Sequence, residues 1–173
     1  MNLDAAIENG EFHVVYQTVV ETASGAICAM EALLRWRHPD LGAIPPSEFI
    51  PLAEETGSII PITRWVFAHV ADQLRQWRRD GVEPRRIFVN VSGQQFIRDD
   101  LPGYFRKLQA AEPDLIPFFG IEITEQAAIQ NMEATVAAIR ELAETGVGAA
   151  LEDFGTGYSS LSYIHRLPIP KIK

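Results

Sequence analysis

The segments FHVVYQTVV (residues 12–20) and AICAMEALLR (residues 26–35) decide the fold of this 173-residue chain. Both are apolar runs of a length typical of β-strands. Only residues 21–25 lie between them, whereas a parallel crossover needs about a dozen residues or more. The two strands are therefore predicted to pair antiparallel.

Four further apolar runs follow at wider spacing and are predicted to be strands: residues 86–92, 118–124, 147–153 and 169–173. The intervening stretches are long enough for helical crossovers, so the sheet is predicted to be parallel from the second strand onward. This pattern predicts an α/β fold that resembles a TIM-like (β/α) barrel with an antiparallel first strand. A complete barrel has eight strands and typically about 250 residues. With about six strands in view, the barrel is expected to be incomplete.

Prolines and glycines mark the predicted helix ends: Pro46 and Pro61 lie near two starts, and Gly81 and Gly146 follow two ends. The clearest helix has one apolar face with a period of 3.6 residues. The members of that face are Ile62, Trp65, Val66, His69, Val70, Leu74 and Trp77. Its two tryptophans and its histidine are predicted to pack against the barrel wall.

Composition restricts the classes of partner. The chain is 47% hydrophobic and 22% charged, as a globular domain is, and its net charge of −8 disfavours binding to nucleic-acid polymers. A basic cluster within residues 75–86 is interpreted as a solvated helix end. The single cysteine, Cys28, has apolar neighbours and is predicted to be a small buried residue. No apolar run reaches the roughly 18 residues of a membrane span, so a cytoplasmic location is expected.

Polar residues stand in five of the predicted strands, and the active sites of α/β barrels lie at the C-terminal ends of the strands. They are Glu31, Asn90, Glu122 with Glu125, Glu152 with Asp153, and Lys173. Taken singly, each acid is expected to pair with a nearby arginine, such as Arg35 or Arg37. Taken together, the carboxylates and the amide form a set of hard oxygen ligands that suits Mg²⁺ or Mn²⁺.

The acid pair Glu152 and Asp153 suggests a reaction, because adjacent acids at one strand end are able to serve two ions. Two ions a few ångströms apart activate water for attack on a phosphodiester, so phosphoester hydrolysis is the predicted chemistry. Lys173 is interpreted either as a group that orients that water or as a terminal tail. The segment FGTGYSSLSYI (residues 154–164) is interpreted as a strand-to-helix connection capped by Ser159.

Six segments together resemble a known family: YQTVV, MEALLRWRHP, IPPSEFIPLAEETG, NVSGQQF, IEITE and EDFGTGYSSLSYIHRLPI. In order and spacing they are similar to the EAL domain, and the resemblance covers the chain from about residue 3. It implies that residues 1–173 form an EAL domain without its C-terminal portion. It also implies a barrel with a reversed first strand that hydrolyses cyclic di-GMP to linear pGpG with two Mg²⁺ or Mn²⁺ ions.

The resemblance assigns roles to individual residues. The implied metal ligands are Glu31, Asn90, Glu122, Glu152 and Asp153, the last of which also serves the water between the ions. Lys173 would assist that water, and Glu125 would hold the catalytic loop in place. Gln17 and Arg35 resemble positions that contact the dinucleotide, and the forked guanidinium of an arginine suits phosphate.

The chain departs from the family pattern at several positions. Position 152 is Glu where the family has Asp, and the extra methylene is expected to disturb metal–oxygen distances. The late catalytic glutamate and the last two strands of the family fall after residue 173. Thr18 stands where Pro is usual, and Gly93 and Gln94 stand where Ala and Arg are usual. These milder changes are expected to loosen a loop or to remove a positive contact.

Three hypotheses for function follow. The first is a cyclic di-GMP phosphodiesterase, the second a catalytically degenerate receptor for the dinucleotide, and the third a protein-interaction regulator that keeps only the fold. The retained acids weigh against the third, because a scaffold has no physical need for buried carboxylates. The resemblance also makes a homodimer and an upstream sensor or cyclase domain candidate partners.

Overall fold

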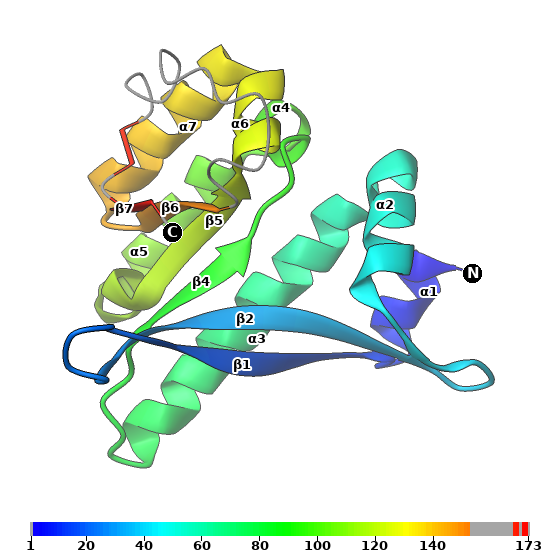
Figure 1. Ribbon diagram of the computed structural model, residues 1–173, viewed down its shortest axis with the longest axis horizontal. Coiled ribbons are helices and arrows are strands. Elements are labelled where there is room, and N and C mark those ends of the chain that lie inside the picture. Colours follow the sequence, from blue (N-terminus) through cyan, green and yellow to red (C-terminus); the bar gives the residue numbers. More distant parts are fainter. Residues whose placement is uncertain (1, 153–167, 170, 173) are drawn as a thin grey trace. The chain divides into compact units, whose positions relative to one another are not determined.

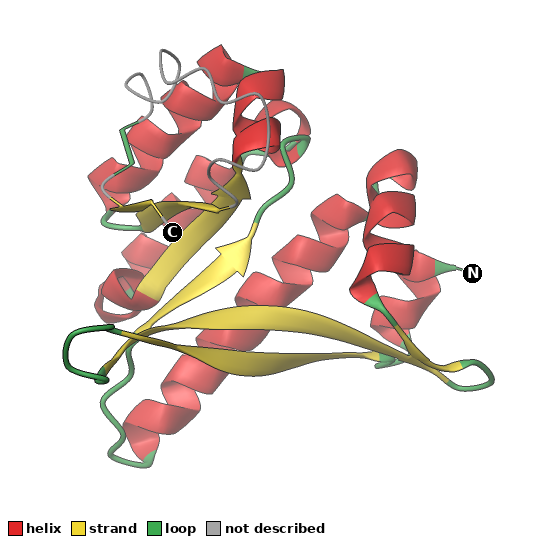
Figure 2. Ribbon diagram, viewed as in Figure 1, coloured by secondary structure: helices red, strands yellow, loops and turns green. Residues whose placement is uncertain are grey.

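The computed structural model describes residues 2–152, 168–169 and 171–172 (Figure 1). Helices alternate with strands along most of this length, as an α/β fold requires (Figure 2). The chain divides into two compact units, Met1–Val89 and Asn90–Lys173. Each unit has its own strands and covering helices.

The first unit has a mostly antiparallel arrangement of strands in the order β1-β2-β4, with β3 paired to β2. Its elements are α1 (Leu3–Glu8), β1 (Phe12–Val20), β2 (Ile27–His38), β3 (Gly42–Ile44), α2 (Pro46–Thr56), α3 (Ile59–Arg79) and β4 (Arg86–Asn90). Strands β1 and β2 pair antiparallel, which confirms the prediction from their short connection. Strands β2 and β4 pair parallel, also as predicted.

An aromatic cluster forms the core of the first unit. The ring of Phe12 lies 5.5 Å from that of Trp36 and 5.9 Å from that of Phe49, and all three side chains are buried. The Trp36 indole donates from Nε1 to Glu11 Oε2 at 2.8 Å. That bond holds the pKa of the Glu11 carboxyl below its usual value, since it favours the charged form.

Helix α3 packs by the predicted face. Its aliphatic members Ile62, Val66, Val70 and Leu74 are buried. The ring of Trp65 contacts Phe12 of β1 at 6.3 Å, and that of Trp77 contacts Tyr16 of β1 at 5.3 Å. The two tryptophans therefore pack against the strand, which confirms their predicted place. The ring of His69 stacks on that of Trp65 within the helix.

The prediction that Cys28 is buried was wrong, because the side chain is exposed. The strand register passes from Val19↔Ala29 to Val20↔Ile27, so Cys28 is the extra residue of a β-bulge. Its Sγ lies 3.4 Å from the Val19 carbonyl oxygen. The adjacent pair of Val20 and Ile27 is itself exposed, so apolar neighbours in sequence do not provide burial here.

The second unit has parallel strands in the order β5-β6-β7. Its elements are α4 (Gln95–Arg98), α5 (Leu101–Ala111), the 3₁₀-helix η1 (Pro113–Phe118), β5 (Phe119–Thr124), α6 (Glu125–Gln130), α7 (Met132–Thr145), β6 (Gly148–Glu152) and β7 (Lys171–Ile172). The predicted parallel pairing is thus confirmed here too. Gly146 ends α7 with a φ of 96°, the left-handed conformation that favours glycine.

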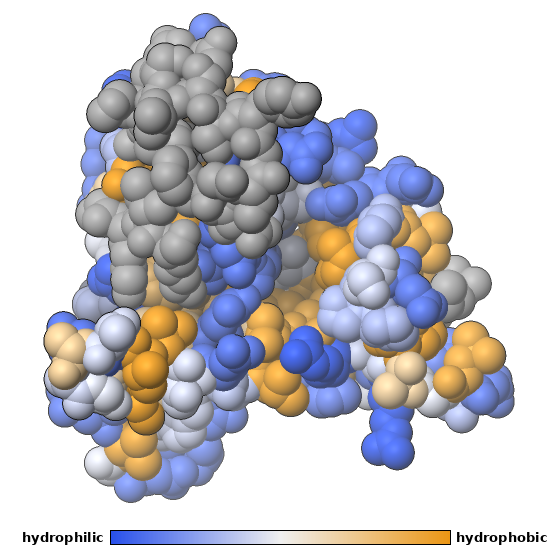
Figure 3. All heavy atoms as spheres, viewed as in Figure 1, coloured by the Kyte–Doolittle hydropathy of each residue, from blue (hydrophilic) through white to orange (hydrophobic). Residues whose placement is uncertain are grey.

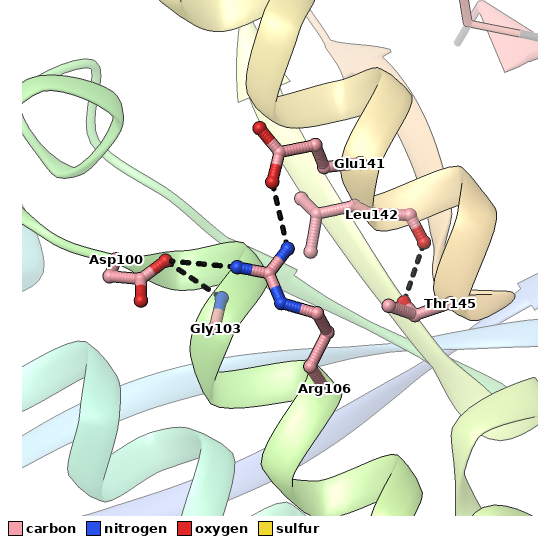
Figure 4. Close-up of polar contacts among 6 residues, drawn as sticks. All are labelled: Asp100, Gly103, Arg106, Glu141, Leu142 and Thr145. Carbon is pink, nitrogen blue, oxygen red and sulfur yellow. Dashed lines mark hydrogen bonds and ion pairs between the residues drawn. The ribbon is translucent and has the colours of Figure 1, made fainter.

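Polar bonds join α5 to α7 on the surface of the second unit (Figure 4). Arg106 of α5 donates to Glu141 of α7 at 2.8 Å and lies 3.7 Å from Asp100. Asp100 also caps α5, because its side chain accepts from the Gly103 amide at 2.8 Å. Below this polar layer the Phe105 ring meets buried Phe119 of β5 edge-on at 5.4 Å.

Apolar residues, in orange, are scattered among polar residues, in blue, on the face shown in Figure 3. Large apolar side chains that are exposed include Val15, Val20 and Ile27 on β1 and β2. Among the described residues, no helix combines the length and the apolar character needed to cross a membrane.

Candidate functional site

Two glutamates lie close together on β5 and β6 of the second unit. Thr124 of β5 pairs with Glu152 of β6, and Glu122 pairs with Ala150. Because side chains alternate between the faces of a strand, Glu122 and Glu152 share one face. Their carboxylates approach to within 4.8 Å of one another, and Glu122 is completely buried.

Asn90 and Glu125 flank the strand that carries Glu122. The Val91 amide donates to the Glu122 carbonyl at 2.8 Å, which places the chain at exposed Asn90 beside β5. Glu125 is 8% exposed and opens α6, where the Thr124 hydroxyl accepts from the Ala127 amide at 3.2 Å. The second unit therefore gathers three of the predicted metal ligands around the end of β5 and adds the predicted loop-positioning glutamate next to it.

The first unit gathers the other predicted residues on one face of the β1–β2 ladder. Gln17 of β1 is the direct partner of Glu31 of β2, and directly opposed side chains lie about 5 Å apart. Arg35 lies four residues beyond Glu31 on the same strand and thus on the same face. Its guanidinium donates to the Leu34 carbonyl at 2.9 Å, which uses one of its five donors.

Some predicted site residues lie outside the described part of the chain. They are Asp153, Lys173 and the connection at residues 154–164 with its proposed cap Ser159.

The register shows one residue that the sequence analysis missed. His13 is the direct partner of Arg35 and is exposed on the same face as Gln17. Counting back from Gln17 in steps of two would have found it, because this step returns to the same face of a strand.

Gly93 occupies a tight place, although it was expected to loosen a loop. The residue is buried, and a Cβ built on it would lie 3.0 Å from the Ala127 carbonyl oxygen. The absence of a side chain at position 93 therefore permits a close approach of this loop to α6.

The electrostatics of the carboxylate pair favour a hard cation. Two ionised carboxylates at this separation repel each other, and burial of Glu122 strengthens the repulsion because the local dielectric constant is low. A divalent cation would offset both costs. The donors are oxygens, the type that Mg²⁺ and Mn²⁺ prefer.

The family assignment rests on the whole chain, since the sequence model described as "EAL domain" matches residues 1–173. This chain belongs to the EAL domain family. The EAL domain is 39% identical to the cyclic di-GMP phosphodiesterase PdeR of Escherichia coli (strain K12), over 99% of this chain and 26% of that protein. It is 38% identical to the bifunctional diguanylate cyclase/cyclic di-GMP phosphodiesterase MucR of Pseudomonas aeruginosa, over 99% of this chain and 25% of that protein.

A solved structure shares the fold of this EAL domain. The PaMucR phosphodiesterase in complex with c-di-GMP superposes with a TM-score of 0.88 at 37% identity, over 98% of this chain and 69% of that one. This likeness confirms the predicted incomplete TIM-like α/β fold. The chain spans 25–29% of the length of the first four curated relatives it matches.

Proposed function

We propose that this EAL domain hydrolyses cyclic di-GMP to linear pGpG with the help of two divalent ions. The observation that carries the proposal is the close pair of Glu122 and Glu152 near the C-terminal ends of adjacent parallel strands. Its family context supports the substrate, because PdeR and MucR carry the name of cyclic di-GMP phosphodiesterases. A cation at this pair and a phosphodiester beside it would account for the buried acids.

The proposed ligand set comprises Glu31, Asn90, Glu122, Glu152 and Asp153, with Mg²⁺ or Mn²⁺ as the ions. The fit rests on the chemistry of the donors, since carboxylate and amide oxygens suit these cations better than they suit zinc. Two oxygens that bind one ion at the usual distance of about 2.1 Å lie at most about 4.2 Å apart. The carboxylates of Glu122 and Glu152 lie within 4.8 Å, so a small side-chain shift would bring both to one ion. Ions bound there would supply an activated water for attack on phosphorus.

The remaining proposed roles concern binding and proton transfer. Gln17 and Arg35 would hold the dinucleotide, with the arginine fork on a phosphate. Asp153 would take a proton from the attacking water while the water oxygen forms a bond to phosphorus. The bond from phosphorus to the 3′ oxygen breaks, and that oxygen takes up a proton as linear pGpG is released. Lys173 would orient the water, and Glu125 would hold the loop that carries the catalytic groups.

A second candidate function is a receptor that binds cyclic di-GMP without cleaving it. The specific observation in its favour is Glu152, whose side chain is one methylene longer than the family's aspartate. Metal sites tolerate changes of only about 0.2 Å in ligand distance, so the longer side chain would displace an ion or strain its rotamer. Gln17 and Arg35 would contact the dinucleotide directly, so binding through them would not require an undisturbed ion.

Chromatography distinguishes the two candidates. The protein expressed from its complete reading frame is incubated with cyclic di-GMP and Mn²⁺, and the nucleotides are then separated. Formation of pGpG that is lost in Glu31→Ala but kept in the exposed control Glu83→Ala supports the phosphodiesterase. Binding of cyclic di-GMP without product supports the receptor, and neither binding nor product from a folded protein contradicts both.

Two further partners belong to this proposal. A sensor or cyclase domain upstream of the EAL domain is proposed because MucR, by its name, combines a diguanylate cyclase with a phosphodiesterase. A homodimer is proposed on the family resemblance alone, and sedimentation of the purified protein tests it directly.

A further inference from the structure

We propose that His13 is a further substrate-binding residue, which donates a hydrogen bond to a phosphodiester oxygen beside the one held by Arg35. The inference rests on the proposed function and extends it to a residue outside the family motifs. It starts from the β1–β2 register, which places His13 directly opposite Arg35. Directly opposed side chains in an antiparallel pair are close enough to contact the same group.

The face that carries His13 has three cross-strand pairs of different chemistry. Gln17 faces Glu31, Val15 faces Leu33, and His13 faces Arg35. The apolar pair Val15–Leu33 therefore lies between the acidic end of the face at Glu31 and the pair of donors at Arg35. A cyclic dinucleotide carries its two phosphodiesters in one macrocycle, from which the purines project. The donors of the His13–Arg35 pair suit a phosphodiester oxygen, and the apolar pair beside them suits the sugar and base next to it.

Packing does not explain the histidine. Phe12 and Tyr16 lie on the opposite face of β1, where they contact Trp36 and Trp77. His13 is exposed and points away from that aromatic cluster, as strand alternation requires. Val15, the next residue on its face, is 39% exposed despite being apolar. Burial in the core therefore does not account for the residue at position 13.

The phosphodiester is favoured over the base as the partner of His13 because of its neighbour. Arg35 presents donors and positive charge, and an anionic group between Arg35 and His13 would accept from both. A purine stacked on the imidazole would instead need the ring face, which leaves the imidazole N–H groups without a role. The two partners therefore predict opposite orders of affinity for cyclic di-GMP in a donor-retaining and a ring-retaining substitution.

The test uses protein expressed from its complete reading frame and unlabelled cyclic di-GMP. Calorimetry in EDTA measures the dissociation constant, and turnover with Mn²⁺ gives kcat and KM. His13→Gln keeps a donor, whereas His13→Phe keeps a ring without a donor. Thr18→Val is the matched control, because Thr18 is an exposed residue of the same strand on its other face. Circular dichroism verifies that each variant is folded.

We expect His13→Phe to weaken binding about tenfold, the effect of losing one charge-assisted hydrogen bond at a partly exposed site. His13→Gln should bind within about threefold of the unsubstituted protein, and Thr18→Val should bind unchanged. The value of kcat should change less than about twofold, because His13 contacts no reacting atom. Tight binding by His13→Phe would overturn the inference while leaving the proposed function intact. Absence of binding by the unsubstituted protein would instead overturn the proposed function and this inference with it.

Discussion

Replacing Glu122 with Gln should stabilise this EAL domain when metal ions are absent and should reduce the stabilisation that metal ions give it. The two carboxylates lie within 4.8 Å, and two charges at that distance repel by about 3.5 kcal/mol at an effective dielectric constant of about 20. Glu152 is half-buried, and water near it roughly halves that value. Glu122→Gln keeps the size of the side chain and removes one charge. In EDTA the free energy of unfolding of the variant should therefore be about 1–2 kcal/mol higher than that of the unsubstituted protein.

In the presence of metal ions the unsubstituted protein should instead be the more stable of the two. An ion that binds only the folded protein stabilises it by about 4.1 kcal/mol at a concentration of about 1,000 times its dissociation constant. The variant lacks one carboxylate ligand, so we expect it to gain less than about 1 kcal/mol under the same conditions. Urea denaturation at pH 8, in EDTA and in Mn²⁺, measures both free energies of unfolding. The unsubstituted protein should be the less stable of the two in EDTA and the more stable in Mn²⁺.

Glu83→Gln is the control, because it removes the same charge from an exposed residue between α3 and β4. Its free energy of unfolding should change by less than about 0.5 kcal/mol in either buffer. The reasoning fails if Glu122→Gln is the less stable protein in EDTA and gains as much from Mn²⁺ as the unsubstituted protein does. That result would mean that the carboxylate pair is a structural contact and holds no ion.

Three further predictions concern activity, ionisation and stability. Glu152→Asp should raise Mn²⁺-dependent release of pGpG by about tenfold, since it restores the shorter ligand, and an unchanged rate would remove the reason for regarding Glu152 as a handicap. Burial raises the pKa of Tyr16 to about 12, so the protein should lose stability as pH rises from about 10 to about 12. Tyr16→Phe should abolish that loss and remove one late step from the absorbance titration of tyrosine. The Arg106–Glu141 pair is exposed, and a double-mutant cycle in urea should give a coupling of about 0.5 kcal/mol that falls in 1 M salt.

Strand pairing followed from the sequence because connection length leaves few choices. The five residues after β1 exclude a crossover, and the longer stretches later in the chain favour one. Strand ends were less accurate. β2 continues to His38 instead of ending at Arg35, because Trp36, Arg37 and His38 pair with β3. That pairing depends on the turn at residues 39–41, whose effect on register is not visible in hydropathy.

Two other features carry little signal in the sequence. α1 is six residues long, too short to show a helical period, and is fixed by the Asn2 cap and by burial of Leu3 and Ala6. The bulge at Cys28 changes which residues oppose each other without changing the apolar pattern. Local composition therefore predicted burial where the register produces exposure.

The candidate site was predictable wherever alternation alone determines a face. Glu152 ends β6 and Glu122 lies two residues before the end of β5, and the period of two brings them together once β5 and β6 are parallel. The same period places His13 on the face of Gln17, but an exposed histidine in a strand has no hydropathy signal, and the register shows that it lies opposite Arg35. Connection length predicts which strands pair, but the register that sets residue against residue is a property of the fold and cannot be read from either strand alone.

Gly93 shows how a departure from a family pattern acquires a different meaning from its surroundings. In sequence, glycine in place of alanine indicates a freer backbone, and this suggested a looser loop. In the structure the residue is buried against α6, and an added Cβ would lie only 3.0 Å from the Ala127 carbonyl. A backbone carbonyl within a helix yields less than the end of a flexible side chain, so alanine would push the loop and α6 apart. Since α6 begins at Glu125, directly after the strand of Glu122, the small residue at position 93 helps to set the position of the site itself.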